Sequence, residues 1–435
     1  AQACLRERIG VEGLDRFDAV AHDQRVMAYS KAQAQVREQW LTDAPARMLS
    51  KRGGGGGSST GGLARELEKT TRRLGTRPLL RKYGKAIQEL TPLVLASPSS
   101  VVDLIEPGVM EFDVAIFDEA SQITVPEAIG AIGRANAVIV VGDSKQMPPT
   151  RKVGGGGNDD DDDAPDQEEI VEDQESILSE CELARVPTLS LIWHYRSQDE
   201  ALIAFSNRAY YRGALSSFPT PTLLSSETGV EFRRVHGVDG EDTAMYLRAG
   251  SQRVHLDGGV VAGSNTNPYE AAEIVDYVHQ LVHATDTRPS LGIVTFNEQQ
   301  RQLIEDLLHA SEDPKIAEVM DPATMGRGEV LFVKALEQVQ GDERDVIIFS
   351  VAFSKQANGK IPTNFGPLSN SGGERRLNVA VTRARRKNVV FCSFDPQELD
   401  VAGASYQGPK DLKEFLLFAK AAGAIGEQAT GGRAV

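Results

Sequence analysis

The stretch Ala137–Thr150, AVIVVGDSKQMPPT, decides the fold class of this chain. It opens with a continuous apolar run, which is typical of a strand that is buried on both faces of a parallel sheet. It then breaks at Gly142-Asp143 into a polar segment with two prolines. Because α/β proteins bind their ligands at the carboxyl ends of parallel strands, we expect this turn to contact a ligand.

Apolar runs of similar length recur along the chain and alternate with amphipathic helical patterns. Strand–helix alternation on this scale predicts an α/β fold with a parallel sheet. Ser197 and Glu200 form a capping-box pattern that predicts the start of one helix. The further expected strands are PLVLAS (92–97), DVAIFD (113–118), LGIVTF (291–296), DVIIFSVAF (345–353) and NVVFCSF (388–394), and the expected helices are 22–41, 197–211, 270–282 and 297–310.

The net charge of −15 is unevenly distributed along the chain. Residues 159–175 hold eleven acidic side chains and no basic one, so the remainder carries only −4. We expect residues 158–175 to be mobile, since like charges repel and such a segment buries little apolar surface. Basic clusters occur at 65–85 and 374–387. A local basic patch, rather than the total charge, determines contact with phosphates.

The hydropathy of the sequence and its cysteine and histidine residues restrict the classes of protein to which the chain can belong. The 435 residues contain no run of about 18 apolar residues, so we expect no membrane span. The three cysteines are far apart in the sequence, which favours reduced thiols and a cytoplasmic location. The seven histidines show no ligand-like cluster, and we expect no structural metal. Because the first residue is Ala and not Met, we expect the chain to be part of a longer protein.

Two adjacent carboxylates end the expected strand DVAIFD. Since neighbouring strand residues point in opposite directions, Asp118 can hold a metal-bound water while Glu119 faces an attacking water. Nucleotide hydrolysis needs both functions. Acidic residues at the start of a helix are the alternative interpretation. A second strand end, with Asp143 and Gln146 after Gly142, favours hydrolysis.

Arginines stand in two later polar segments. Arg196 precedes an expected helix, and Arg383 and Arg385 precede the expected strand NVVFCSF. Two arginines that approach one polyphosphate neutralise the charge of its transition state. Solvated or ion-paired arginines are the alternative interpretation. The segment before the strand DVIIFSVAF adds Gln340, Gly341 and Glu343.

Taken in order, five segments resemble motifs II, III, IV, V and VI of superfamily 1 helicases. They are DEAS (118–121), GDSKQMPP (142–149), HYRS (194–197), QGDERD (340–345) and NVAVTRAR (378–385). The closest branch contains senataxin and the nonsense-mediated-decay helicase, and the resemblance covers about residues 90–400. It implies tandem RecA-like parallel-sheet domains with ATP bound between them. The implied division is 1–77 (a helical accessory segment with a Gly-rich loop), 78–187 (an incomplete first domain with motifs II and III and a disordered acidic loop) and 188–435 (a second domain with motifs IV to VI).

The resemblance also assigns roles to single residues. Asp118 would bind Mg²⁺, Glu119 would activate water and Gln146 would sense the γ-phosphate. Arg196 and Arg383 would be the arginine fingers. The other residues that the resemblance places at the nucleotide are Gly142, Asp143, Gln340, Gly341 and Glu343. Those that it places on the nucleic-acid path are Ser97, Ser99, Thr295 and Gln300.

The chain departs from the family pattern in one important respect. It contains no GxxxxGK(S/T), the P-loop that holds the β- and γ-phosphates and precedes motif II in the family. We therefore expect a fragment of an ATP-dependent helicase or translocase, inactive alone, that acts 5′ to 3′ on single-stranded nucleic acid, DNA more than RNA. An upstream P-loop region would complete it, and residues 408–425 resemble the segment that leads to a nuclease-like domain. A module that binds nucleic acid or assembles with partners without ATPase activity is the alternative.

Overall fold

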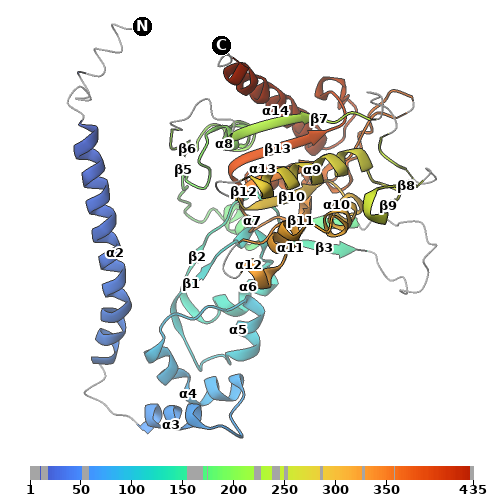
Figure 1. Ribbon diagram of the computed structural model, residues 1–435. Helices are drawn as coiled ribbons and strands as arrows, with labels where there is room; N and C mark the ends of the chain where they lie inside the picture. Colours follow the sequence, from blue (N-terminus) through green and yellow to red (C-terminus); the bar gives the residue numbers. More distant parts are fainter. Residues whose placement is uncertain are drawn as a thin grey trace. The chain divides into compact units, whose positions relative to one another are not determined.

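The computed structural model describes most of the chain as two compact units (Figure 1). The described residues are 10, 18–50, 58–153, 170–173, 175–219, 227–237, 245–248, 253–284, 288–325, 329–356 and 358–431. Grouped by their contacts, residues up to 115 together with 126–139 form the first unit. Residues 116–125 together with those from 140 onward form the second unit.

Helices dominate the first unit. They are α2 (Ala19–Ser50), α3 (Ser58–Glu68), α4 (Thr76–Leu90), α5 (Pro98–Leu104) and most of α6 (Val125–Ile132). The amphipathic α4 buries Tyr83 and Ala86, which pack with Leu63 of α3. α2, by contrast, leaves apolar side chains such as Val26 and Trp40 exposed. The polar helix expected at 22–41 is confirmed as part of α2.

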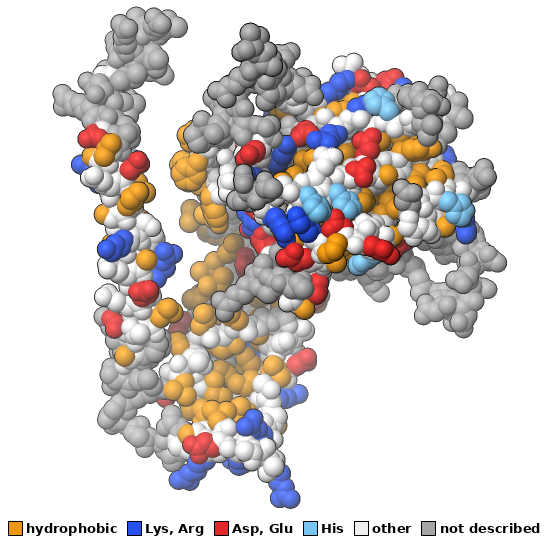
Figure 2. Space-filling view, viewed as in Figure 1, with side chains coloured by type: hydrophobic (Ala, Val, Ile, Leu, Met, Phe, Trp, Pro, Cys, Tyr) orange, Lys and Arg blue, Asp and Glu red, His pale blue; other side chains and the backbone are white. Residues whose placement is uncertain are grey.

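Two paired strands follow these helices. β1 (Phe112–Phe117) and β2 (Ala135–Val140) form a two-stranded sheet, and α6 connects them in the chain. Apolar side chains of both strands remain exposed, among them Val114 and Val138. Hydrophobic side chains also gather on the visible surface of this part of the chain in Figure 2. The strands expected at 113–118 and 137–143 are confirmed, but their expected burial on both faces is wrong, because most residues of both strands are exposed or only partly buried.

The strand expected at 92–97 is not formed. These residues connect α4 to α5 without secondary structure, and Leu93 and Leu95 are 73% and 89% exposed. A β-strand needs a neighbour that satisfies its N–H and C=O groups. Within the described residues, β1 and β2 pair with each other and with no third strand. The apolar pattern alone is therefore insufficient, because the strand lacks a partner.

A five-stranded sheet forms the centre of the second unit. Its strands are β7 (Gly229–Arg234), β10 (Leu291–Thr295), β11 (Phe332–Ala335), β12 (Arg344–Ser350) and β13 (Ala384–Cys392). Their order is β11–β10–β12–β13–β7, and every neighbouring pair is parallel. The α/β class and three of these strands are thus as expected. The sequence does not predict β7 and β11, because charged residues interrupt their short apolar patterns.

Helices cover both faces of this sheet (Figure 1). They are α8 (Ala201–Ala209), α13 (Gly373–Val381) and α14 (Gln407–Gly431) on one face, and α9 (Pro268–His283), α10 (Glu298–Ala310) and α11 (Pro314–Met320) on the other. In β12, Ile347 and Phe349 face the first group, whereas Val346 and Ile348 face the second. Successive strand residues point to opposite faces, so the continuous apolar run of β12 follows from burial on both sides.

Short elements complete the second unit. They are α7 (Ile177–Leu183), α12 (Pro322–Met325), β3 (Thr150–Val153), β4 (Ile170–Asp173), β5 (Trp193–His194), β6 (Ser216–Ser217), β8 (Val254–His255) and β9 (Val261–Ala262), with 3₁₀ turns at Ala120–Gln122, Asp257–Gly259, Leu336–Gln338, Gly366–Ser369 and Pro396–Glu398.

One of these strands lies in the acidic segment 158–175. β4 pairs antiparallel with β3 and places Glu172 opposite Arg151. The expectation of a mobile segment is therefore wrong for residues 170–173. Residues 158–169 and 174 lie outside the described residues, as do residues 53–57 and 154–157. Residues 58–62, the rest of the first Gly-rich segment, belong to α3 and form no loop.

The capping box expected from Ser197 and Glu200 is absent. α8 begins only at Ala201, and the side chain of its N-cap residue, Glu200, makes no capping hydrogen bond. The Ser197 hydroxyl instead donates to the carbonyl of Ala384, 3.3 Å away, at the start of β13. This long-range hydrogen bond replaces the local capping pattern.

The two compact units do not coincide with the predicted segments 1–77, 78–187 and 188–435. Residues 116–125 and 140–187, which carry motifs II and III, group with the residues of the five-stranded sheet. The predicted domain boundaries stay a prediction, because a grouping of contacts does not test independent folding. None of the helices in the described residues is both long enough and apolar enough to cross a membrane.

Candidate active site

The turn after β1 presents both predicted catalytic carboxylates. Asp118 and Glu119 directly follow the buried Phe117, and both are exposed. Asp118 Oδ1 accepts the N–H of Glu119 at 3.0 Å. Glu119 has a left-handed backbone with φ of 51°, which is uncommon for a residue with a side chain and is concentrated at functional sites.

The turn after β2 lies against this acidic turn. The N–H of Val141 donates to the carbonyl of Phe117 at 2.8 Å. A Cβ at Gly142 would lie 3.0 Å from the backbone nitrogen of Ser121, so this close approach favours glycine. The structure therefore brings the turns of motifs II and III together.

Asp143 is the centre of a hydrogen-bond cluster. Its Oδ1 accepts the N–H of Lys145 at 2.9 Å, and its Oδ2 accepts from Gln146 Nε2 at 3.1 Å and from the Tyr211 hydroxyl at 2.6 Å. Asn378 Nδ2 donates to the Tyr211 hydroxyl at 3.0 Å and to the Lys145 carbonyl at 2.9 Å. Burial, together with the charge of Asp143, raises the pKa of Tyr211. The cluster ties motif III to motif VI.

Arg196 forms an ion pair with Glu343. Its Nε donates to Glu343 Oε2 at 2.8 Å, and its Nη1 donates to the carbonyl of Thr382 at 3.4 Å. The hydrogen bond from Arg196 lowers the pKa of Glu343. Both side chains remain partly exposed, so motifs IV and V meet at the surface of the unit.

Arg383 is nearly buried, with 3% of its surface exposed. Its Nε donates to the carbonyl of Val379 at 2.7 Å, and its Nη2 donates to the Thr382 hydroxyl at 3.0 Å. Burial, and then the positive charge of Arg196, lower the pKa of Arg383 to about 10, while the charge of Glu119 acts in the opposite direction. The charges of both Arg196 and Glu119 therefore act on Arg383. Within the described residues, no carboxylate forms a salt bridge with it.

Motif V contacts the acidic turn through Gln340. Its Nε2 donates to Glu119 Oε2 at 3.3 Å. Its Oε1 is buried and has no hydrogen-bond partner among the described residues, which leaves an acceptor that those residues do not satisfy. The next residue, Gly341, has φ of 88°, a conformation that favours glycine.

Arg385 has a different environment from that of Arg383. It forms salt bridges with Glu329, Glu343 and Asp345 and donates to the Ser290 hydroxyl at 2.9 Å. These interactions, that with Glu329 above all, raise the pKa of Arg385. Its charge is therefore neutralised within the fold, which agrees with the ion-paired alternative for this arginine.

Two residues predicted on the nucleic-acid path, Thr295 and Gln300, are fully buried. The Thr295 hydroxyl donates to the carbonyl of Asn297 at 2.8 Å. Gln300 Oε1 accepts the N–H of Asn267 at 2.7 Å, and its Nε2 donates to the Ser350 hydroxyl at 3.1 Å. Because these polar groups bond within the fold, their burial argues against a direct contact with nucleic acid.

The other two residues predicted on that path are exposed. Ser97 is the N-cap of α5 and accepts the N–H of Ser100 at 3.2 Å. Its hydroxyl oxygen lies 3.0 Å from that of Ser99. The two hydroxyl groups thus lie side by side at the surface, and their contact with phosphates stays a prediction.

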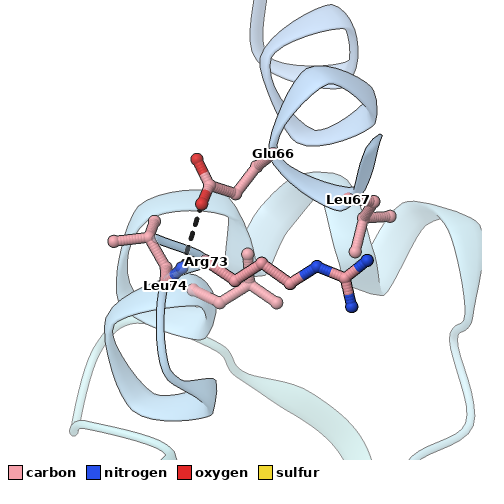
Figure 3. Close-up of a pocket in the computed structure, with 5 residues that line it drawn as sticks. Glu66, Leu67, Arg73 and Leu74 are labelled. Carbon is pink, nitrogen blue, oxygen red and sulfur yellow. Dashed lines mark hydrogen bonds between the residues drawn. The ribbon is translucent and has the colours of Figure 1, made fainter. Parts of the chain in front are cut away.

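A pocket in the first unit lies apart from these motifs in the sequence (Figure 3). Its lining residues are Glu66, Leu67, Arg73, Leu74 and Leu79. Glu66 is 6% exposed and accepts the N–H of Leu74 at 3.0 Å. This hydrogen bond fixes the loop between α3 and α4. None of the predicted site residues lines the pocket.

Two family models, both described as AAA domain, match this chain. One covers residues 93–152 and the other covers residues 174–395, just over half of the chain. Together they include motifs II to VI, whose turns make up the site. The chain belongs to this AAA-domain family, within the superfamily 1 helicases.

Curated relatives of this helicase-family chain are longer than the chain itself. The uncharacterized ATP-dependent helicase MG140 of Mycoplasma genitalium is 32% identical over 354 residues, which are 78% of this chain and 28% of that protein. The DNA replication ATP-dependent helicase/nuclease DNA2 of Homo sapiens is 25% identical over 295 residues, which are 64% of this chain and 24% of that protein. The chain thus spans about a quarter of the length of these relatives.

A solved structure was also similar to this helicase-family chain. PRRSV helicase matches 64% of this chain and 34% of its own, with 14% sequence identity and a TM-score of 0.28. This likeness is too weak to support an inference about the fold or the site.

Sequence reasoning missed two residues of this helicase core. Tyr211 lies just after α8, and only its position at the end of a predicted helix distinguishes it from other tyrosines. Asn378 opens the NVAVTRAR segment, where the arginines carry the more recognisable signal. Asn378 is a polar amide between the apolar residues Leu377 and Val379. A polar side chain within an apolar helical pattern needs hydrogen-bond partners when it is buried, and this is the signal that could have identified Asn378.

Proposed function

We propose that this chain is part of an ATP-dependent helicase or translocase, and that its second unit supplies residues that act on the γ-phosphate. The observation that carries the proposal is that Arg383 is nearly buried and forms no salt bridge with a carboxylate in the described residues. An unpaired buried cation is costly. A phosphate is an anion that would neutralise it, and the relatives named above are called ATP-dependent helicases.

The two exposed carboxylates suit the metal and the water of hydrolysis. Mg²⁺ prefers oxygen ligands, and the exposed carboxylate of Asp118 at the end of β1 fits this preference. Bound there with ATP, Mg²⁺ would neutralise charge on the phosphates. Glu119, oriented by Gln340, would accept the proton of the attacking water.

The arginines and the Asp143 cluster would respond to the nucleotide. Arg196 would exchange its partner Glu343 for a phosphate oxygen, since both are anionic acceptors. Gln146 is held by Asp143, whose other contacts reach Tyr211 and, through it, motif VI. A shift of Gln146 toward the γ-phosphate would therefore be transmitted to the helix that precedes Arg383.

The first unit offers a surface for the nucleic-acid backbone. We define the α3–α4 basic surface by its exposed cationic residues, Arg65, Lys69, Arg72, Arg73, Arg77, Arg81, Lys82 and Lys85. Arg77 and Arg81 share the carboxylate of Glu106 at 3.4 and 3.5 Å, which leaves a net positive surface in an acidic chain. Such a surface binds phosphates of any sequence, and the hydroxyl groups of Ser97 and Ser99 would add contacts.

The finer features of the proposal rest on the family resemblance. They are action on single-stranded nucleic acid, a preference for DNA over RNA, and 5′ to 3′ movement. A relative named as a helicase and nuclease of DNA replication supports DNA and a nuclease-like domain in the parent protein. Two free cysteines, Cys181 and Cys392, suit the reducing cytoplasm.

ATP hydrolysis with Mg²⁺ tests this proposal. The chain alone should hydrolyse little ATP, because it lacks GxxxxGK(S/T). In a longer form that contains a P-loop, Arg383→Ala should reduce turnover on the order of 10³-fold, as for a lost arginine finger. Single-strand binding without nucleotide should change far less. Arg386→Ala is the matched control, since this neighbouring arginine pairs with Glu227.

The outcomes separate the helicase from its alternative. Normal hydrolysis with lost strand binding would move Arg383 from the nucleotide site to the nucleic-acid path. Absence of a P-loop in every longer form, together with strand binding and no hydrolysis, would favour the binding or assembly module. The missing P-loop in the present 435 residues is the observation that keeps this second function in consideration.

A further inference from the structure

Two histidines and an aspartate converge on the second unit, away in the sequence from all helicase motifs. His279 and His283 lie one turn apart on α9, and Asp313 is the N-cap of α11. Asp313 Oδ2 lies 2.9 Å from His279 Nδ1 and 2.7 Å from His283 Nε2. The expectation that the histidines form no ligand-like cluster is therefore wrong. The i, i+4 spacing of the two histidines is the signal that the sequence contained.

The fold holds this cluster in place from both sides. Asp313 Oδ1 accepts the N–H of Lys315 at 2.8 Å, so helix capping fixes the carboxylate and directs Oδ2 toward the rings. The two imidazole rings lie nearly parallel, with an interplanar angle of 14°. Ile316 of α11 is buried among residues of α9 and α10. The carboxylate and the rings are thus supported by separate packed helices.

We propose that His279, His283 and Asp313 bind one divalent transition-metal ion of the Zn²⁺ class. Their three donor atoms lie within 4.8 Å of one another. Ligands of tetrahedral zinc, with bonds of about 2.0–2.2 Å, lie roughly 3.3 Å apart. The two separations from Asp313 Oδ2, 2.9 and 2.7 Å, need to open by only about half an ångström. The partly exposed rings can rotate to allow this.

The donor set selects the class of metal. Two imidazole nitrogens and one carboxylate oxygen suit Zn²⁺ and its neighbours in the first transition row, whereas Mg²⁺ and Ca²⁺ prefer all-oxygen sites. Three protein ligands leave a fourth position for water. The ion would bridge α9 and α11, and because it binds the folded chain it would raise the stability of the second unit.

The competing interpretation is an ion pair between Asp313 and protonated histidines. An ion pair needs an ionised carboxylate, and the hydrogen bond from His283 lowers the pKa of Asp313 to about 2. The two interpretations differ in their pH dependence. Metal binding requires neutral imidazoles and therefore weakens in acid, whereas an ion pair with protonated imidazoles strengthens in acid.

Calorimetric titration of the chelator-treated chain with ZnCl₂, in excess Mg²⁺ to occupy oxygen-only sites, tests the proposal. We expect one Zn²⁺ per chain at pH 7.5 and a rise of a few degrees in Tm. His279→Gln and His283→Gln should each weaken Zn²⁺ binding by at least about tenfold. Asp313→Asn should also weaken it, while asparagine preserves the helix cap. His309→Gln, an exposed histidine on α10, should bind as the wild type does.

Two further measurements distinguish the loss of this metal site from unfolding of a variant and from metal binding at a cysteine. The Tm of each variant without metal shows whether the variant folds. Co²⁺ in place of Zn²⁺ should give the visible spectrum of nitrogen and oxygen ligands without thiolate absorption. No saturable binding at pH 7.5, histidine variants that bind Zn²⁺ as tightly as the wild type does, or a thiolate spectrum that places the ion at a cysteine would each overturn the proposal.

Discussion

At the scale of single residues, the arginines of the second unit differ in how far the fold neutralises them. Arg385 meets three carboxylates and Arg196 meets one. Arg383 is more deeply buried than either and has no such partner within the described residues. Since no carboxylate in the described residues forms a salt bridge with it, Arg383 is the arginine best placed to respond to an anionic ligand. All three arginines occur in similar polar segments of the sequence, so only their hydrogen-bond and salt-bridge partners in the fold distinguish their roles.

Tyr211→Phe should destabilise the second unit by about 1–2 kcal/mol. The variant removes the hydroxyl between Asp143 and Asn378 and leaves the Asp143 carboxylate with one acceptor position unfilled. Urea unfolding followed by fluorescence measures the change. Tyr406→Phe is the control, because Tyr406 is exposed. Equal unfolding free energies for the two variants would show that the Asp143 cluster contributes nothing to stability.

At the scale of elements, α3, α4 and the loop between them carry the exposed cationic side chains of the α3–α4 basic surface. Glu66 turns inward and accepts the N–H of Leu74, which fixes the loop between the two helices. Arg72 of this loop has a left-handed backbone with φ of 53°. Such strain persists only where the surrounding structure imposes it. The α3–α4 basic surface is therefore presented by a fixed loop and two helices.

Arg72→Ala combined with Arg73→Ala should weaken single-strand binding in a salt-dependent way. Each lost phosphate contact reduces the slope of log K against log salt by about 0.7 for single strands. Fluorescence anisotropy with oligonucleotides of two unrelated sequences, at several salt concentrations, measures this slope. Arg288→Ala, which removes an exposed arginine paired with Glu318, should leave it unchanged. A loss of affinity without a change in slope would mean that these arginines contact no phosphate.

At the scale of the whole second unit, a buried polar network joins α9 to the ends of two central strands. Glu270 is fully buried and accepts from the Ser350 hydroxyl at 2.6 Å, the Ala352 N–H at 2.6 Å and the Ser393 hydroxyl at 3.1 Å. Burial raises the pKa of Glu270 to about 7, although these hydrogen bonds act in the opposite direction. Folding therefore favours the protonated form of this carboxyl group.

The stability that Glu270 confers should fall as pH rises from about 4.5 to about 7. Its folded-state pKa lies above the ordinary value of 4.5, so in this window the folded chain holds a proton that the unfolded chain has lost. Glu270→Gln removes this titration. Urea unfolding at pH 5 and pH 8 should show that the wild type loses stability relative to the variant. Glu414→Gln, at an exposed site, should show no such trend, and a pH-independent difference for Glu270→Gln would refute the prediction.

The sequence by itself determined the α/β class, most of the central strands and the order of the motif-bearing turns. These features depend on local patterns, in which apolar runs end in polar turns. Only the tertiary structure decided which polar residues are available. In the folded chain Gln300 is buried, and Arg385 forms salt bridges with carboxylates. Residues 92–97 have no strand partner, and Tyr211 forms a hydrogen bond with Asn378, 167 positions away in the sequence. The physical reason is that burial and hydrogen bonding depend on partners distant in the sequence, which no local pattern of residues contains.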